Sequence, residues 1–453
     1  MSKTVKLRKG LDIRLVGEAD KVMSEFLMPK SVSLKPSDFH GMTPKMTVKE
    51  GQEVKIGEVI FFNKYQEQVK CVSPVSGTVR SIVRGEKRRI IEVIIDADGK
   101  QTSTDGIPVD VASISSEDLK SKMLEMGLWM FIKQRPIDIV ANPNNAPKAI
   151  FVSAFDSSPL SPDFDFMLHG QNKNFQAGLD ALAKLTEGKV HLTLNGNVPA
   201  DETFTSASNV QINKIVGKHP AGNVGTQIHH IDPVNKGEFV WTVNAQDVMI
   251  IGKSLLAGVL DPHKTINLTG SSANHRKYFK TVLCADLNSL IHDKIDGDNV
   301  RVISGNPLTG DKVAADGHLG FYHNQITIIP EGDEYKFFLT TGWLGHGFDK
   351  FSNSRLFPTW LTPNKKFTLD TNTNGEERGF VVTGELDKVF PFDILPMQLV
   401  KAAITDDIDS MESLGIYEVA PEDFALCEYV CTSKINIQDK IRNGLDLIQS
   451  ECM

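Results

Sequence analysis

The sequence predicts a multidomain protein that combines β and α/β architecture, and three observations support this fold class. First, 453 residues exceed the size at which one hydrophobic core stops growing, so the chain should divide into several domains. Second, short alternating apolar runs separated by glycine dominate residues 1–105, which is typical of β-structure. Third, buried strands alternate with runs of helical spacing from residue 106 onward, which favours a sheet covered by helices.

Residues 1–105 are expected to form one compact all-β domain. Two similar halves, at 47–60 and 72–79, each place glycine at a turn between apolar strands. This pair of turns resembles the biotinyl/lipoyl-type barrel-sandwich hybrid, in which a hairpin presents a modified lysine. The spacing places the hairpin tip nearer Gln66 than Lys64. We therefore interpret the domain as structural, with modification of Lys64 as the alternative.

Residues 106–257 are expected to form an α/β domain. Ser116 can cap a helix that ends at Gly127, and a strand, helix and strand follow at 149–154, 175–185 and 189–194. Ligands bind at the carboxyl ends of the strands in such sheets, so the loop at 155–159 is a candidate ligand loop. A plain turn with an Asx-type hydrogen bond is the alternative.

The remaining chain is expected to hold three further parts. These are a small α+β domain at 258–320, a β-rich segment at 321–395 and a helical domain at 396–453. The elements expected in them are strands at 265–268, 299–304, 325–329 and 335–340, and helices at 278–290, 399–404 and 437–448.

Charge and composition exclude several classes of protein. The net charge of -8 argues against general nucleic-acid binding, which requires a basic face. Residues 1–105 carry 19 Lys/Arg against 14 Asp/Glu, whereas residues 396–453 carry 4 against 11. These opposite charges suggest faces for different neighbours or an attraction between the two ends. Five scattered cysteines, and a basic N-terminus with no apolar segment behind it, predict a cytoplasmic protein with reduced thiols.

The longest apolar stretch, 248–260, is too short to cross a bilayer, so a membrane contact is expected only through partner proteins. Within it, Gly252, Lys253 and Ser254 resemble the end of a phosphate-binding loop, but Asp247 stands where that motif requires glycine. No dinucleotide, metalloprotease or serine-hydrolase motif is present either. The sequence therefore predicts no catalytic residue.

Cys427 and Cys431 lie one helical turn apart and supply half of a metal or cluster site. Tetrahedral zinc needs four ligands and no histidine lies within the last 58 residues, so we expect structural thiols. A remnant or inter-subunit metal site is the alternative.

The segment 219–230 is the densest polar constellation in the sequence. Its glycines let the backbone approach a ligand, and its imidazoles can hydrogen-bond a carbonyl oxygen, which would suit a quinone headgroup. Tight turns and packed histidines are the alternative. A second glycine- and aromatic-rich loop at 342–348 favours structure or a protein interface. The candidate ligand residues are His219, Gly222, Gly225, His229 and His230.

Taken together, these motifs resemble one family nearly end to end: the A subunit of the Na⁺-translocating NADH:quinone oxidoreductase, a relative of the C subunit of the Rnf electron-transfer complex. The motifs that carry the resemblance are Lys9 to Asp12, Ser73 to Gly77, Arg84 to Arg88, Gln134 to Pro136, Ala149 to Val152, His219 to Gly222, Val224 to Thr226, Arg301 to Gly305 and Cys427 to Cys431.

The resemblance implies a peripheral subunit on the cytoplasmic face of the bacterial inner membrane. Its six-subunit complex is a translocase that oxidises NADH, reduces ubiquinone or menaquinone and exports Na⁺. FAD, FMN, riboflavin and the iron centres belong to the other subunits, as do the NADH and quinone sites, so this chain is expected to bind no cofactor itself. The implied domains are a barrel-sandwich hybrid, a Rossmann-like domain, a soluble-ligand-binding β-grasp domain and a helical C-terminus.

The resemblance leaves the role of this chain open. The Rnf subunit binds iron–sulfur clusters in its C-terminal helices, and here only Cys427 and Cys431 remain. The first hypothesis is a docking or scaffold subunit that touches quinone at most. The alternatives are a quinone site of its own at 219–230 and an Rnf-type electron-transfer subunit.

Overall fold

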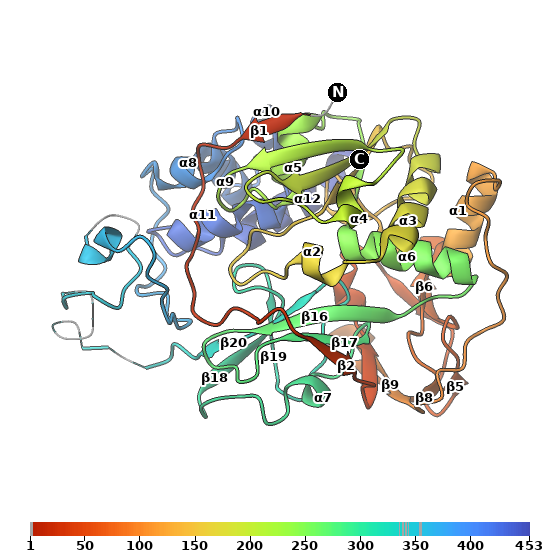
Figure 1. Cartoon of the computed structure of the whole chain (residues 1–453). Coiled ribbons are helices and arrows are strands. Elements are labelled where there is room, and N and C mark those ends of the chain that lie inside the picture. Colours follow the sequence, from red (N-terminus) through yellow and green to blue (C-terminus); the bar gives the residue numbers. More distant parts are fainter. Residues whose placement is uncertain (1–2, 335, 338, 340–341, 343, 353–355) are drawn as a thin grey trace.

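The computed structural model describes residues 3–334, 336–337, 339, 342, 344–352 and 356–453, which form four sheets and several groups of helices (Figure 1). Among these described residues, no helix combines the length and apolarity that crossing a bilayer requires.

Two small antiparallel sheets form the N-terminal β-structure. They share a core with side chains such as Val32, Phe61 and Val79. The turn between the hairpin strands is Lys64 and Tyr65, so the expectation that the tip lies nearer Gln66 is wrong. The hairpin register pairs Asn63 with Gln66 and leaves only two residues for the turn. The strands are β3 (Ser31–Leu34), β9 (Ile90–Ala97), β8 (Gly77–Arg84) and β5 (Glu53–Val54) in one sheet, and β4 (Pro44–Met46), β6 (Val59–Asn63) and β7 (Gln66–Val72) in the other.

Two N-terminal strands belong to other sheets, which corrects the expectation of a single all-β unit over 1–105. β1 (Thr4–Lys6) pairs in parallel with β14 (Gln211–Val216), and β2 (Met23–Phe26) pairs with β17 (Tyr278–Val282). An alternating apolar pattern predicts a strand but does not specify its neighbour. The first thirty residues therefore tie the later domains together.

The seven-stranded sheet has the order β1-β14-β13-β12-β15-β10-β11, with its first five strands parallel. Ile150 and Val152 of β12 (Ala149–Ser153) pack in one core, and Ala149 and Phe151 pack in another with Ile228. The strand is therefore buried on both faces, as its continuous apolar run predicts. The other strands are β13 (Lys189–Asn195), β15 (Val240–Asn244), β10 (Lys133–Arg135) and β11 (Ile139–Val140).

Helices α3 (Asn172–Lys184) and α6 (Ala245–Ala257) cover one face of this sheet, in contact with each other. They cross where a Cβ on Gly178 would lie 2.0 Å from the Val248 carbonyl, so glycine permits the close approach. The strand-helix-strand unit predicted from 149 to 194 is confirmed. The remaining helices of this region are α1 (Ser116–Glu125), capped by Ser115, η3 (Leu128–Phe131), α2 (Phe164–Met167), α4 (Glu202–Thr205) and α5 (Val224–Ile231).

A six-stranded mixed sheet follows, in the order β19-β18-β20-β16-β17-β2. The helix expected at 278–290 is wrong, because its first residues form β17 and only α7 (Leu287–Ile291) is helical. The alternation of Tyr278, Phe279 and Val282 fits a half-buried strand, and Cys284 with φ +57° turns the chain. The other strands are β16 (His263–Thr269), β18 (Val300–Ser304), β19 (Asp311–Val313) and β20 (Gln325–Pro330).

The described part of the segment 321–395 is not β-rich, which corrects the expectation. Beyond β20, its described residues hold only η4 (Pro358–Leu361) and α8 (Glu385–Val389) as regular elements. The strand expected at 335–340 lies partly outside the described residues, since 335, 338 and 340 are not described, and neither is residue 343 of the loop at 342–348.

The C-terminal region is helical, as predicted, and has its own core. Leu399, Val400, Ile441, Leu445 and Ile448 pack together there at full burial. Its elements are α9 (Pro396–Ile404), α10 (Ile408–Ser413), η5 (Ile416–Glu418), η6 (Pro421–Phe424), α11 (Ala425–Val430) and α12 (Ile437–Cys452); η1 (Pro36–Asp38) and η2 (Glu86–Arg88) lie in the N-terminal β-structure.

Candidate functional site

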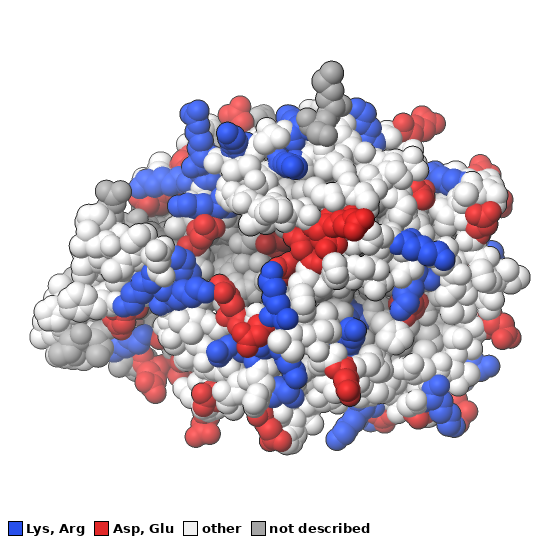
Figure 2. All heavy atoms as spheres, viewed as in Figure 1, with Lys and Arg blue, Asp and Glu red and all other residues white. Residues whose placement is uncertain are grey.

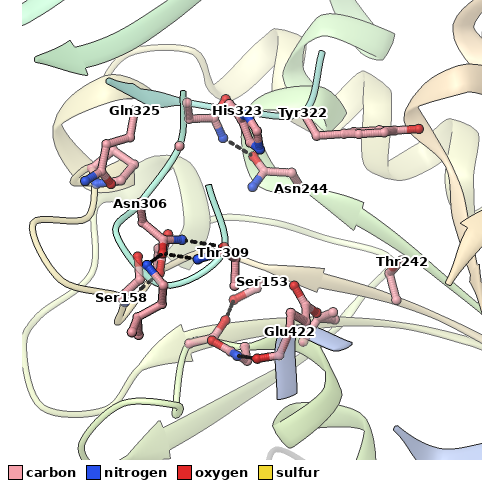
Figure 3. A pocket seen from close by; sticks show the side chains of 18 of the residues that line it. Ser153, Ser158, Thr242, Asn244, Asn306, Thr309, Tyr322, His323, Gln325 and Glu422 are labelled. Atoms are coloured by element: carbon pink, nitrogen blue, oxygen red, sulfur yellow. Dashed lines mark hydrogen bonds between the residues drawn. The ribbon is translucent and has the colours of Figure 1, made fainter. Parts of the chain in front are cut away.

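A cavity of about 400 Å³, here called the cleft, lies where the seven-stranded sheet, the six-stranded sheet and the C-terminal helices meet (Figure 3). Ser153 ends β12 and Asn244 ends β15, and these residues are partners in the parallel register. Four of the five parallel strands run β14-β13-β12-β15, so the chain order reverses between β12 and β15. A reversal of this kind opens a crevice at the carboxyl ends of the strands, where ligands bind in α/β proteins.

The loop after β12 reaches the cleft, as the sequence predicts. Phe155, Asp156 and Ser158 line the cavity. The backbone N–H of Ser158 donates to Asp156 Oδ1 at 2.7 Å, so the Asx-type turn considered as the alternative is also present. Burial raises the pKa of Asp156 above its ordinary value. The turn thus holds a carboxyl group at the cleft in an environment that disfavours its ionisation.

The lining carries more carboxyl groups than cations. Asp247 at the start of α6 is fully buried, and burial raises its pKa to about 6. Glu422 of η6 is accessible from the cleft yet surrounded by protein, and burial raises its pKa to about 7. Lys133 is the one lysine or arginine among the described residues of the lining, and its Nζ lies 3.6 Å from the Asp138 carboxylate and 4.6 Å from the centre of the Tyr322 ring. Electrostatics therefore disfavour an anionic ligand here.

The candidate residues of 219–230 do not form one site. His219 and Gly222 line the cleft, whereas Gly225, His229 and His230 do not. The segment is also not a continuous loop, because α5 begins after Asn223 and includes the last three of these residues. The sequence interpretation missed the helix because it is short and Gly225 interrupts its helical pattern.

His219 is buried and lines the cleft. Its Nδ1 lies 3.0 Å from Ser157 Oγ, and its backbone N–H donates to Asp12 Oδ1 at 2.9 Å. Its Nε2 is buried and has no hydrogen-bond partner among the described residues. Burial lowers the pKa of His219 to about 4, so the ring is neutral near pH 7. A buried ring nitrogen of this kind can bond a ligand or a water that enters the cleft.

The two candidate glycines make different close approaches. A Cβ on Gly222 would lie 2.5 Å from the backbone nitrogen of Ser157, in the loop that lines the cleft. A Cβ on Gly225 would lie 2.2 Å from the Asp423 carboxylate, in the C-terminal helices. Glycine at 222 therefore lets two cleft loops touch, and glycine at 225 lets α5 touch the C-terminal helices.

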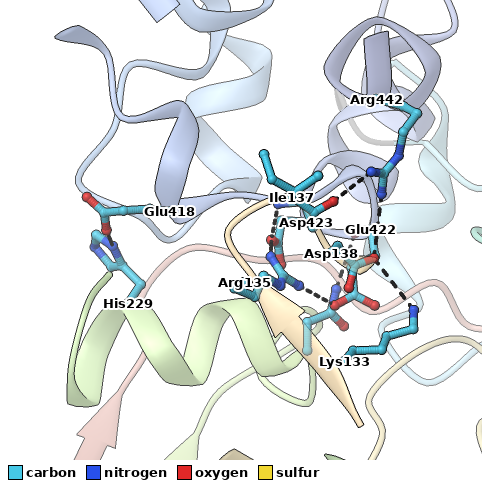
Figure 4. A network of polar contacts seen from close by, with 11 residues as sticks. Lys133, Arg135, Ile137, Asp138, His229, Glu418, Glu422, Asp423 and Arg442 are labelled. Atoms are coloured by element: carbon cyan, nitrogen blue, oxygen red, sulfur yellow. Dashed lines mark hydrogen bonds and ion pairs between the residues drawn. The ribbon is translucent and has the colours of Figure 1, made fainter. Parts of the chain in front are cut away.

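His229 joins α5 to the C-terminal region. The Asp393 backbone N–H donates to its Nε2 at 2.9 Å, so Nδ1 carries the proton and donates to Glu418 Oε2 at 2.8 Å (Figure 4). Its ring stacks on Phe392 with centroids 4.8 Å apart. Both ring nitrogens are occupied, and this histidine is a domain contact.

His230 lies at the same end of α5. Its ring is edge-on to the His229 ring, with centroids 5.1 Å apart. Burial lowers its pKa to about 4, and its Nε2 has no hydrogen-bond partner among the described residues. It does not line the cleft, so the geometry gives it no contact with a ligand there.

Sequence reasoning missed the charged cluster that closes the back of the cleft, here called the Arg135 cluster: Lys133, Arg135, Asp138, Glu422, Asp423 and Arg442 (Figure 4). Arg135 is fully buried, and it donates to Asp423 Oδ2 and Glu422 Oε1, both at 2.6 Å. Arg442 donates to the Ile137 carbonyl at 2.6 Å. Burial opposes ionisation of Asp138, but the charges of Lys133, Arg135 and Arg442 lower its pKa.

Arg135 and Asp423 lie 288 residues apart in sequence, so no local pattern predicts their contact. The sequence indicated this region only through the motif Gln134 to Pro136 in the family resemblance. The cluster fixes η6 against β10, so the C-terminal helices form one wall of the cleft.

Cys427 lies within α11 and Cys431 directly follows this helix, both buried in the C-terminal core. Burial raises the pKa of the Cys427 thiol, which disfavours the thiolate that binds metals. No group of three or more possible metal ligands gathers among the described residues. The local environment of these two thiols is therefore that of packed core side chains.

Comparisons with known proteins give three matching family models. They are the NqrA N-terminal barrel-sandwich hybrid domain at residues 5–98, the NqrA second alpha/beta domain at 114–260 and the NQRA C-terminal domain at 265–315. The A subunit of the Na(+)-translocating NADH-quinone reductase of Rhodopirellula baltica is 39% identical, with 98% of both chains covered. This chain belongs to the NqrA family.

Other members of the NqrA family are similar over the same length. The NqrA protein of Marinomonas sp. is 37% identical, with 98% of this chain and 99% of that protein covered, and that of Pseudomonas aeruginosa is 36% identical, with 99% and 100% covered. Among solved structures, an NAD⁺-reducing [NiFe]-hydrogenase is 11% identical in sequence, and the match covers 76% of this chain and 64% of the hydrogenase chain. Its TM-score of 0.38 is too low to support an argument.

The expected barrel-sandwich hybrid and the α/β domain are thereby confirmed, as is the resemblance to NqrA.

Proposed function

We propose that this chain is the peripheral docking subunit of a Na⁺-translocating NADH–quinone reductase, on the cytoplasmic face of the bacterial inner membrane. It is a subunit of an oxidoreductase that couples electron transfer from NADH to quinone with Na⁺ transport. Its own work is to hold partner subunits in place. The full-length match to NqrA proteins carries the assignment to this complex, because it covers 98% of the chain.

The distribution of charge supports the docking role. Several carboxylates of residues 396–453, here called the tail, are paired within the chain, since Glu422 and Asp423 bind Arg135, and Glu412 binds Lys236. Asp406 and Asp409 of the tail are not buried, and no ion pair to them occurs in the described part of the chain. These carboxylates are available to a cationic partner surface, and a contact of this kind weakens as salt screens it.

Removing the acidic tail would test folding and not docking, because α9 to α12 bury their own core and hold the Arg135 cluster. The sharper variant is Asp406→Asn with Asp409→Asn in the assembled complex. We expect the chain to dissociate from membranes at lower salt than the wild type, with an unchanged unfolding transition. The matched control is Glu117→Gln with Glu187→Gln, two exposed carboxylates outside the tail to which no ion pair occurs in the described part of the chain. Elution at the same salt in all three proteins would contradict the tail as a docking face.

We also infer the finer fold relationships. The order β14-β13-β12-β15 supports a Rossmann-like domain, and the mixed sheet that contains β16 to β20 supports a soluble-ligand-binding β-grasp domain. The relationship to the Rnf C subunit belongs to this inference as well. An Rnf-type electron-transfer role has little support from this structure, because Cys427 and Cys431 are packed in a core.

Quinone binding by this chain is a second candidate function, and the cleft favours it. A quinone headgroup is an uncharged ring with carbonyl oxygens, and the cleft combines an excess of carboxyl groups with aromatic walls at Phe131, Phe155 and Tyr322. The phosphates of FMN and NADH would meet Asp156, Asp247 and Glu422 at the same site. Charge therefore favours the quinone over the anionic cofactors.

Calorimetric titration of the full-length chain with a soluble short-chain ubiquinone tests the second candidate. We expect binding of the quinone, no binding of FMN or NADH, and affinity about tenfold lower in His219→Gln, as loss of one hydrogen bond predicts. His229→Gln is the matched control, since that ring lies outside the cleft. Equal affinity in both variants, or no quinone binding, would remove the quinone function and leave the docking function intact.

A further inference from the structure

One part of the molecule turns apolar side chains outward. The described residues between 336 and 366, which are 336–337, 339, 342, 344–352 and 356–366 and are here called the lobe, lie apart from the body between β20 and Phe367 (Figure 1). Of the nineteen large apolar side chains that are exposed in the described part of the chain, seven lie in this short segment, which is a strong concentration. They are Phe337, Leu339, Leu344, Phe348, Leu356, Trp360 and Leu361.

The base of the lobe is fixed to the body. Phe367 is buried, its backbone N–H donates to the Arg14 carbonyl at 2.8 Å, and its carbonyl accepts from Val16 at 2.9 Å. At the other side of the base, Glu331 binds Arg301 at 2.5 Å and Lys312 at 3.0 Å. Anchors on both sides hold the lobe at one place on the surface.

Polar groups inside the lobe are satisfied while its apolar groups face outward. Thr359 Oγ1 donates to the Lys350 carbonyl at 2.6 Å, and the Phe351 ring packs on Phe367 with centroids 5.5 Å apart. Leu356 is 71% exposed, Leu361 63% and Phe348 65%. Exposed apolar groups in such a cluster indicate a surface that is covered in the working protein.

The charged groups of the lobe indicate the chemistry of what covers it. Residues 336–366 contain five lysines and arginines against one aspartate and no glutamate, within a chain of net charge -8. Two of these lysines are paired with acidic side chains outside the lobe, Lys336 with Asp370 and Lys366 with Glu18. The amino groups of Lys350 and Lys365 bond backbone carbonyls, which carry no net charge to neutralise them. Figure 2 shows at the left a mostly uncharged surface, with both basic and acidic side chains where it joins the body.

Aromatic, leucine and lysine side chains together match the boundary between lipid headgroups and acyl chains of an anionic bilayer, where apolar groups insert and lysines meet phosphates. We propose that the lobe is a lipid-contact element that seats this chain directly on the anionic surface of the membrane. This goes beyond the docking function and replaces the expectation that the chain reaches the membrane only through partners.

Flotation of the full-length chain with lipid vesicles tests the proposal. We expect binding to phosphatidylglycerol–phosphatidylethanolamine vesicles, weaker binding to phosphatidylcholine vesicles and release by salt. Leu356→Ser with Leu361→Ser should bind anionic vesicles about tenfold more weakly, because two partly inserted leucines together lose about the transfer free energy of one fully inserted leucine. Ile107→Ser is the matched control, since Ile107 is 83% exposed outside the lobe. Thermal unfolding of each variant checks that the fold is intact.

Assembly separates lipid contact from contact with another protein of the complex. If the lobe binds lipid, the double serine variant should still join the other subunits in detergent and should lose membrane attachment only in nanodiscs. Absence of vesicle binding by the wild type, equal vesicle binding by the variant, or failure of the variant to join the subunits in detergent would each overturn the proposal. None of these outcomes would affect the assignment of the chain to its complex.

Discussion

The two ends of the segment 219–230 lie only about ten residues apart and serve different neighbours. At the first end, His219 and Gly222 touch the loop that lines the cleft. At the second end, Gly225 and His229 touch Asp423, Glu418 and Phe392 of the C-terminal region. A cluster of glycines and histidines in sequence is therefore not one site, because a helix that begins between them turns its later side chains elsewhere.

The contact between α5 and the C-terminal helices should depend most strongly on Arg135, because this arginine neutralises the Asp423 carboxylate beneath Gly225. Arg135→Met should lower the free energy of unfolding by about 3–5 kcal/mol, since the buried Asp423 carboxylate and the partly exposed Glu422 carboxylate lose their partner. Denaturant unfolding measures the loss. Lys122→Met on the exposed pair with Glu125 should cost less than about 1 kcal/mol. Equal losses would show that the cluster does not hold the domains together.

Gly225→Ala should cause the next largest loss in the free energy of unfolding. The added methyl group would overlap the Asp423 carboxylate, and such overpacking costs about 1–3 kcal/mol. The control is Gly379→Ala, where a Cβ meets nothing within 4 Å. Thermal unfolding compares the two. A Gly225→Ala protein as stable as the control would mean that α5 can move away from Asp423 without cost.

His229→Gln should lower the free energy of unfolding by about 1–2 kcal/mol through loss of its bonds to Glu418 and Asp393. His292→Gln, on an exposed imidazole, should leave it nearly unchanged. Both variants are measured by denaturant unfolding. A change in quinone affinity with unchanged stability in His229→Gln would reverse the assignment of this end of the segment.

The smallest effect is a pH dependence from Glu422, the residue that borders both the cleft and the contact between β10 and the C-terminal helices. Burial raises its folded-state pKa from the ordinary 4.5 to about 7. Between these values the folded protein holds a proton that the unfolded chain releases, so this contribution to stability is full below pH 4.5 and is lost as pH rises through about 7.

Unfolding of the wild type and of Glu422→Gln across this pH range isolates the contribution, because glutamine does not titrate. The wild type should lose stability relative to the variant as pH rises. A difference that is independent of pH would show that the carboxyl group keeps its ordinary pKa.

The sequence predicted those parts of the fold that local pattern determines. The continuous apolar run at 149–153 predicted β12, and the helical spacing from 437 predicted α12. It failed where the partner decides the structure. β1 and β2 pair with strands more than 200 residues away, and Tyr278 to Val282 form a strand because β16 and β2 flank them.

The candidate site was predictable in the same limited way. The loop at 155–159 follows from the rule for carboxyl ends of parallel strands. The sequence did not predict the salt bridges of Arg135 with Glu422 and Asp423, because residues in distant segments show no characteristic spacing in the sequence. His229 and His230 were predicted to contact a ligand because the sequence shows that they are histidines. The sequence does not show which way their rings face, because that depends on where α5 begins.

Hydrogen–deuterium exchange on Gly222→Ala and Gly225→Ala tests the division of this segment most directly, because each methyl group disturbs one end only. We predict that Gly225→Ala speeds exchange in residues 396–453 and leaves the loop at 153–158 protected, and that Gly222→Ala does the reverse. The same exchange pattern in both variants would contradict the account, because the segment would then behave as one site.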